Sequence, residues 1–141
     1  MALRLLVAGA VLGAALAGCG DAGAEPPPEP RDRTVRAGQE VTLAPGGTAR
    51  LPGGFAVKFL GVAGDGRCPR EVQCVWEGDA TVKVEVAAAG ASPVVRELHT
   101  SRRFATRTTV GGRTVGLLGL APEARQGGVP AAEYRARLTL G

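Results

Sequence analysis

The sequence predicts an all-β domain, an antiparallel β-sandwich around one core, with an immunoglobulin-like arrangement as one form that it could take. Three observations support this fold class. Glycine is abundant, with 22 residues in 141, and aromatic residues make up only 4% of the chain. Several short segments alternate apolar and polar residues. Turns that contain Gly or Pro separate them at regular spacing, which is typical of strands joined by tight connections and not of long amphipathic helices.

The first eighteen residues have the features of a secretory leader. Arg4 precedes an apolar run from Leu5 to Leu16, which is short for a membrane-spanning helix and typical of a signal peptide. Leu16-Ala17-Gly18-Cys19 resembles the lipobox of bacterial lipoproteins, in which the cysteine becomes the lipidated first residue. We therefore expect a signal peptide over residues 1–18 and a lipid on Cys19. The alternative is cleavage near Ala17 that leaves Cys19 as a free thiol.

The segment after Cys19 predicts a tether. It contains the run Glu25-Pro26-Pro27-Pro28-Glu29-Pro30, whose residues cannot bury a core and favour an extended, solvated chain. We expect this disordered tether over residues 19–38 and the sandwich domain over residues 39–141. At about 3.1 Å per residue, a tether in the polyproline conformation would reach roughly 60 Å from the membrane.

Eight segments of the domain have strand patterns. The segment 55–62 is apolar on both faces except at Lys58, which indicates a buried strand. Alternation predicts that Ala80 and each second residue to Val86 face the core. Gly111-Gly112 is a two-residue hairpin signal. In chain order, the expected strands are 40–43, 48–51, 55–62, 80–86, 94–100, 106–110, 113–120 and 134–140.

Cys68 and Cys74 are the two cysteines of the mature body, and their spacing predicts a small ring. We expect a disulfide, because export removes the pair from the reducing cytosol and a seven-residue ring would stabilise the fold by roughly 2 kcal/mol. The alternatives are a metal pair, for which only His99 and carboxylates are at hand, and a redox couple, which is more often C-x-x-C. Trp76 should pack in the core near this ring; the alternative is an exposed anchor for a partner.

The residues around the ring also carry a resemblance. Asp65-Gly66-Arg67-Cys68-Pro69, followed by Val72, Cys74-Val75-Trp76 and Gly78, resembles a signature of small bacterial lipoproteins and exported proteins of unassigned function. That signature is Asp-Ser-Arg-Cys-Pro and then Val-x-Cys-Val-Trp-Ala-Gly, so Gly66 stands here for Ser and Glu77 for Ala. The resemblance is close over about fifteen residues and loose over the rest of the domain. It implies membership of that family and brings no activity with it.

Charge and motifs argue against several function classes. The net charge of +4 comes from scattered arginines, so nucleic acid is not an expected partner. Acidic residues around the ring raise the possibility of calcium, but their spacing is not that of a calcium loop, and Arg67 and Arg70 should pair with them. We expect no cofactor. His99 is the sole histidine and no Gly-x-Ser-x-Gly surrounds a serine, which disfavours a hydrolase without excluding one. The acidic residues in question are Asp65, Glu71, Glu77 and Asp79.

We therefore predict a lipid-anchored protein of the cell envelope that works as a non-catalytic binding or structural module. Gly20 after Cys19 favours the periplasmic side of an outer membrane, if the organism has one. The alternative is an envelope hydrolase, or a redox or metal-binding protein, that uses the Cys68/Cys74 loop and nearby acids.

Residues 66–73 are the expected recognition loop, because the ring and Pro69 reduce the entropy lost on binding. The exposed candidates favour a polar or acidic ligand or an envelope protein, unless the loop serves only to close the end of the sandwich. These candidates are Arg67, Arg70, Glu71 and Gln73.

Overall fold

The structure, a computed structural model, describes residues 20, 23 and 26–141. This part of the chain is almost entirely β, with one 3₁₀ helix, η1, over Ala131–Glu133. No helix in the described residues is long and apolar enough to cross a membrane. The strands are β1 Asp32–Thr34, β2 Glu40–Leu43, β3 Thr48–Leu51, β4 Phe55–Asp65, β5 Ala80–Ala87, β6 Val94–His99, β7 Arg107–Val110, β8 Arg113–Ala121 and β9 Arg135–Leu140.

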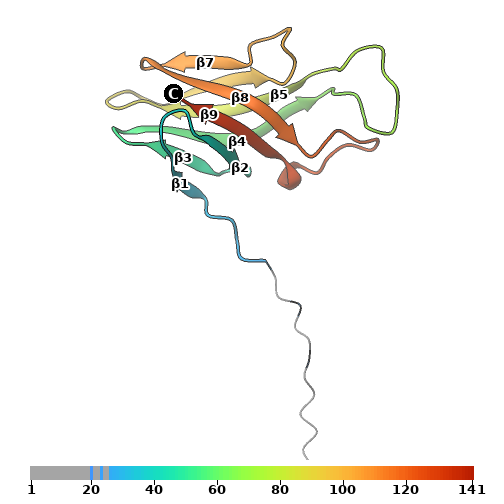
Figure 1. The fold of residues 1–141 in the computed structure, drawn as a ribbon, viewed down its shortest axis with the longest axis horizontal. Coiled ribbons are helices and arrows are strands. Elements are labelled where there is room, and N and C mark those ends of the chain that lie inside the picture. The colour runs from blue at the N-terminus through green and yellow to red at the C-terminus, as the bar shows by residue number, and fades with distance from the viewer. Residues whose placement is uncertain (1–19, 21–22, 24–25) are drawn as a thin grey trace, which may run out of the picture.

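The strands form two sheets that face each other (Figure 1). One sheet has the order β1-β3-β4-β5-β6 and the other has the order β2-β9-β8-β7. All neighbours are antiparallel except β1 and β3, which are parallel. The predicted all-β sandwich is therefore confirmed. In one sheet the strands β3 to β6 pair in sequence order, and this differs from the immunoglobulin order, in which each sheet contains a pair of non-consecutive strands flanked by consecutive ones.

The core lies between β5 on one sheet and β9 on the other. Along β5 the residues Ala80, Val82, Val84 and Val86 are fully buried, as the alternation predicts, and the residues between them are partly exposed. The last strand places Ala136, Leu138 and Leu140 on the opposite wall of the core. In β4 only one face is buried beyond Val57, because Leu60 lies outside.

The hairpin between β7 and β8 turns at the two predicted glycines. Gly111 has φ 59° and Gly112 has φ 75°. Both values lie in the left-handed region that the primed two-residue turn requires, and glycine adopts them without steric cost. The turn brings Val110 opposite Arg113 and sets the register of this pair of strands.

The folded part begins earlier than residue 39, so the predicted boundary of the tether was wrong. β1 lies inside the expected tether and pairs with β3, with Asp32 opposite Thr48. Val35 is buried, and its N–H donates to the Arg50 carbonyl over 2.8 Å. Even Glu29 contacts the domain, through an ion pair of 3.1 Å with Arg135.

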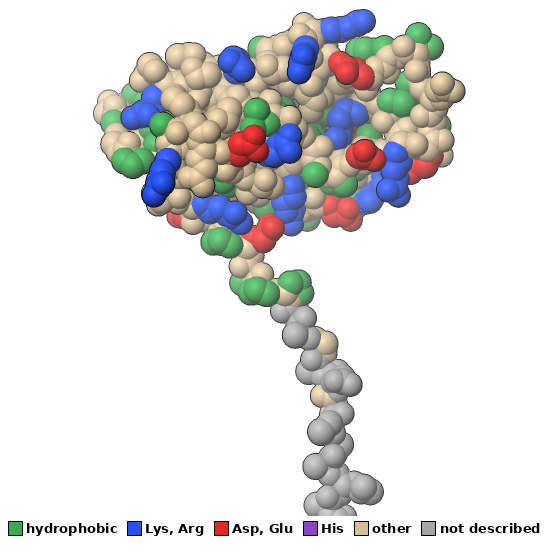
Figure 2. Space-filling model, viewed as in Figure 1, with side chains coloured by type: hydrophobic (Ala, Val, Ile, Leu, Met, Phe, Trp, Pro, Cys, Tyr) green, Lys and Arg blue, Asp and Glu red, His purple; other side chains and the backbone are tan. Residues whose placement is uncertain are grey.

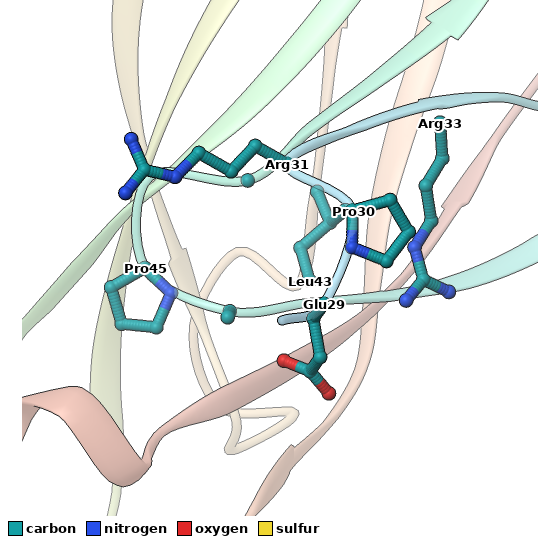
Figure 3. Close-up of a pocket in the computed structure, with 8 residues that line it drawn as sticks. Glu29, Pro30, Arg31, Arg33, Leu43 and Pro45 are labelled. Carbon is teal, nitrogen blue, oxygen red and sulfur yellow. The ribbon is translucent and has the colours of Figure 1, made fainter. Parts of the chain in front are cut away.

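A cavity of about 200 Å³ lies where this N-terminal segment crosses β2 and the turn after it (Figure 3). Glu29, Pro30, Arg31, Arg33, Leu43 and Pro45 line it, with Ala44 and Gly47. The predicted signal peptide and Cys19 lie outside the described residues.

Candidate functional site

The loop of residues 66–79 joins β4 to β5 and projects from one end of the sandwich (Figure 1). Cys68 and Cys74 form the predicted disulfide, with their Cα atoms 5.9 Å apart. At the base of the loop, Gly66 N–H donates to the Asp79 carbonyl over 2.8 Å and Cys68 N–H donates to the Glu77 carbonyl over 2.9 Å. The two arms of the loop therefore continue the antiparallel ladder of β4 and β5 for a few residues before the ring closes.

Gly78 permits this close approach of the two arms. It is buried and has φ 71°, a conformation that side-chain-bearing residues rarely adopt. A Cβ atom added here would collide with the carbonyl oxygen of Gly66 and with the Cα of Arg67. The position therefore requires glycine both for its backbone angle and for the space around it.

Arg67 fixes one side of the loop to the second sheet. Its guanidinium donates from Nε and Nη2 to the two carboxylate oxygens of Asp65, each over 2.8 Å. It also donates to the carbonyls of Leu120 over 2.8 Å and Pro122 over 3.0 Å, at the end of β8. The Arg67 and Asp65 side chains are only 14% and 13% exposed. The expectation that Arg67 faces a ligand was wrong, because its donors are used within the fold.

Tyr134, the residue before β9, completes this network. Its hydroxyl donates to Oδ2 of Asp65 over 2.9 Å. The hydrogen bond and the charge of Arg67 hold the pKa of Asp65 below its ordinary value, with a further contribution from Tyr134. Burial raises the pKa of Tyr134, and the neighbouring Asp65 carboxylate raises it further. At neutral pH the network therefore consists of an ionised aspartate, an arginine and a neutral tyrosine.

Asp79 fixes the other side of the loop to β6. Nδ1 of His99 donates to its carboxylate over 2.6 Å, and Ser101 N–H donates over 2.9 Å. Burial alone raises the pKa of Asp79, but the hydrogen bonds from Ser101 and His99 outweigh burial, and the net shift is downward. Ser101 Oγ donates to Glu77 over 3.1 Å, so a second loop carboxylate binds the same segment.

A hydrogen-bonded His-Asp pair is also found in hydrolases, where it orients the base that activates a serine. In this protein the nearby serine has a different partner. The Ser101 hydroxyl bonds Glu77 and is 1% exposed, and the His99 ring packs against Phe104 with 5.0 Å between ring centroids. The arrangement holds the loop in place and does not present a nucleophile to His99. Sequence reasoning missed this pair, which depends on the β5–β6 register that places Thr81 opposite His99.

The remaining predicted loop residues differ in side-chain exposure and in the hydrogen bonds that they make within the fold. Arg70 has a side chain that is 64% exposed, with Glu71 as a neighbour at 3.5 Å. Glu71 accepts the backbone N–H of Gln126 over 3.0 Å, and this bond is the largest cause of its lowered pKa. Gln73 is exposed. Among the described residues, no three His, Cys, Asp or Glu side chains converge as metal ligands would.

Trp76 is 51% exposed, so the prediction that it packs in the core was wrong. Cys74, Val75 and Trp76 cross the end of the sandwich as irregular chain and enter β5 only at Ala80, while aliphatic side chains fill the core. Val75 is fully exposed, with a relative accessibility of 104%. The guanidinium of Arg103 lies 5.4 Å from the centroid of the Trp76 ring.

Four of the seven exposed large hydrophobic residues in the described chain belong to this end of the molecule; the other three lie on strands. Apolar, basic and acidic side chains are interspersed at this end of the molecule (Figure 2). Exposed apolar side chains gathered at one end of a small protein are candidates for an interaction surface. We define the loop-end surface as Val72, Val75, Trp76, Arg103 and Phe104.

Comparison of the chain with known protein families, curated proteins and solved structures found no match. The function is therefore argued from the chemistry and geometry of the loop end.

Proposed function

We propose that the protein is a lipid-anchored, non-catalytic binding module of the cell envelope, and that the loop-end surface is its contact with a partner. The observation that carries this proposal is an exposed apolar surface with an arginine. It is formed by a loop that a disulfide and two polar networks hold, and by Arg103 and Phe104 of the adjoining β6–β7 loop. Tryptophan and arginine are the residues that contribute most at protein-binding surfaces. A loop that is already fixed loses little conformational entropy when it binds.

The charges around this surface define the partner further. Asp65, Glu77 and Asp79 each accept hydrogen bonds from other parts of the domain, so they hold the loop in place. Exposed Arg70 pairs with Glu71, and the positive charge beside the surface comes from Arg102 and Arg103, which are exposed on the β6–β7 loop. The surface therefore combines apolar contact area with positive charge, which suits a partner that is partly apolar and anionic. The anionic component agrees with the sequence-based expectation of a polar or acidic ligand, whereas the apolar component departs from it.

The membrane anchor in this proposal is a lipid on Cys19. The leader and the lipobox-like residues before it support the anchor. Intact-mass analysis of the membrane fraction should show loss of residues 1–18 and a gain of acyl chains, whereas Cys19→Ser should abolish the acylation. Full-length, unmodified chain in the cytosol would contradict both the anchor and the envelope location.

Site-specific photo-crosslinking in intact envelopes tests the binding surface. A photoreactive residue replaces Val75 in the lipidated protein, and the matched control places it at Val95, which is 50% exposed on β6. Both positions carry exposed valines, so neither replacement disturbs the core. We expect covalent adducts, whether with protein or with lipid, from position 75 in clear excess over position 95. Equal or absent adducts at the two positions would contradict the proposal.

A further inference from the structure

We infer that the partner of the loop-end surface is an anionic lipid bilayer, with Val75, Trp76 and Phe104 inserted at the level of the headgroups. This inference names the partner of the binding module proposed above and rests on that proposal. The membrane concerned is the one to which the chain is anchored. Docking would give the domain a second, reversible contact with the membrane in addition to its lipid.

The exposure of these side chains favours a bilayer. Val75 is the most exposed large hydrophobic residue of the described chain, and it belongs to the loop that projects from the sandwich (Figure 1). The neighbouring cavity, of about 180 Å³, lies at the base of the loop, where Arg67, Glu77, Gly78 and Thr100 line it. Val75, Trp76 and Phe104 do not line this cavity. They are exposed at the protein surface, where apolar side chains are free to enter an apolar layer.

The side-chain chemistry matches the interface of a membrane. Tryptophan prefers the headgroup level, where its ring is in contact with acyl chains and its N–H remains near water. Phe104 and Val75 add apolar area at the same end of the molecule. Exposed Arg102 and Arg103 lie in the same loop as Phe104, and Arg103 covers the Trp76 ring. Apolar side chains combined with arginines favour binding to anionic lipids.

The tether length permits this docking. The ten residues from Gly20 to Glu29 span about 31 Å if they are extended as polyproline. The eleven residues of β4 run toward the loop end and span about 36 Å. The tether leaves the domain beside β1, away from the loop end (Figure 1). The domain can therefore tilt until the loop meets the bilayer, and because the anchor keeps it close, a weak contact suffices.

Trp76 itself provides the readout, because it is the sole tryptophan of the chain. The lipidated mature protein is reconstituted in phosphatidylglycerol-containing vesicles, with or without brominated acyl chains, and in vesicles of phosphatidylcholine alone. We expect a blue shift of Trp76 emission, and loss of its intensity with brominated lipid, in the anionic vesicles. Both effects should weaken as salt is raised, because ions screen the arginines.

A charge-reversal pair tests the role of the arginines. Arg102→Glu/Arg103→Glu should remove the quenching by brominated lipid. The matched control, Arg96→Glu/Arg107→Glu, changes the net charge equally at exposed positions on β6 and β7 and should leave the quenching unchanged. Removing Arg103 from the Trp76 ring could itself change the Trp76 emission. For each variant, the emission in brominated vesicles is therefore compared with that in unbrominated vesicles, so that only quenching by lipid is scored as insertion.

Two results would overturn the inference. One is Trp76 emission that brominated lipid does not change, and the other is quenching that both charge-reversal pairs reduce equally. If position 75 gives only protein adducts in envelopes while Trp76 stays unquenched in vesicles, the membrane contact is refuted and the binding module stands with a protein partner. If neither adducts nor quenching occur, both proposals fail.

Discussion

Replacing Arg67 with alanine should destabilise the domain at least as much as any other single change in the disulfide loop, apart from a substitution of Gly78. The Arg67 guanidinium satisfies both oxygens of Asp65 and the carbonyls of Leu120 and Pro122. Arg67→Ala leaves the Asp65 carboxylate, whose side chain is 13% exposed, with only the Tyr134 hydroxyl and local backbone as partners.

The expected size of the effect comes from this burial. Breaking a largely buried ion pair by removing one partner costs about 3–5 kcal/mol. Water can partly rehydrate Asp65 at the edge of the loop, so we expect the low end, about 3 kcal/mol. For a domain of this size that corresponds to a fall in Tm of roughly 12 to 24 °C. Arg67→Lys should give an intermediate loss, because one ammonium cannot replace a planar fork that reaches four acceptors.

Urea unfolding of the oxidised mature chain at pH 7 measures this free energy. The matched control is Arg70→Ala, three residues away, whose side chain is 64% exposed and pairs only with Glu71 at 3.5 Å. This control should change the free energy of unfolding by less than about 0.5 kcal/mol. If Arg67→Ala is no more destabilising than Arg70→Ala, the network does not hold the loop as described.

The pH dependence of the same measurement provides a second test. Because Arg67 lowers the pKa of Asp65, the stabilisation that Asp65 contributes is fully present above about pH 4, the ordinary aspartate value. It is lost as the pH falls through the lowered native pKa. The difference in stability between wild type and Arg67→Ala should therefore narrow in acid. A difference that stays constant from pH 7 to pH 2 would refute this assignment.

Three further changes test the rest of the loop. Cys68→Ser, Cys74→Ser and the double variant should each lower the free energy of unfolding by about 2 kcal/mol, because one bond is lost in all three; additive losses in thermal melts would contradict this. Gly78→Ala should cost about 2–4 kcal/mol in urea unfolding, because a Cβ collides there. Gly90→Ala, with a similar φ but open space, should cost only about 1 kcal/mol, and equal costs would refute the steric argument. Asp79→Asn should cost about 1.5–3 kcal/mol at pH 7 and progressively less in acid, because the pKa of Asp79 is lowered; a loss that persists at pH 2 would contradict it.

The sequence by itself determined the strands that have one face in the core. In a strand, side chains alternate between faces, so the apolar pattern from Ala80 to Val86 and from Tyr134 to Leu140 identifies the buried face directly. The hairpin at Gly111-Gly112 and the disulfide were predictable for a similar reason. Both depend on residues that are close in sequence, and the short connection restricts the geometry.

Tertiary structure alone decided how the loop is held and which of its side chains face outward. Arg67 meets the Leu120 carbonyl 53 positions later, and Asp65 meets Tyr134 69 positions later. No local pattern contains these partners, so Arg67 had the sequence features of an exposed charge. Trp76 had the features of a core residue for the same reason, because only the packing of the two sheets shows that the core is already filled. The pairing of β1 with β3 likewise joins two segments that are separated in sequence. The proline-rich, polar composition of the segment before residue 39 does not indicate this pairing.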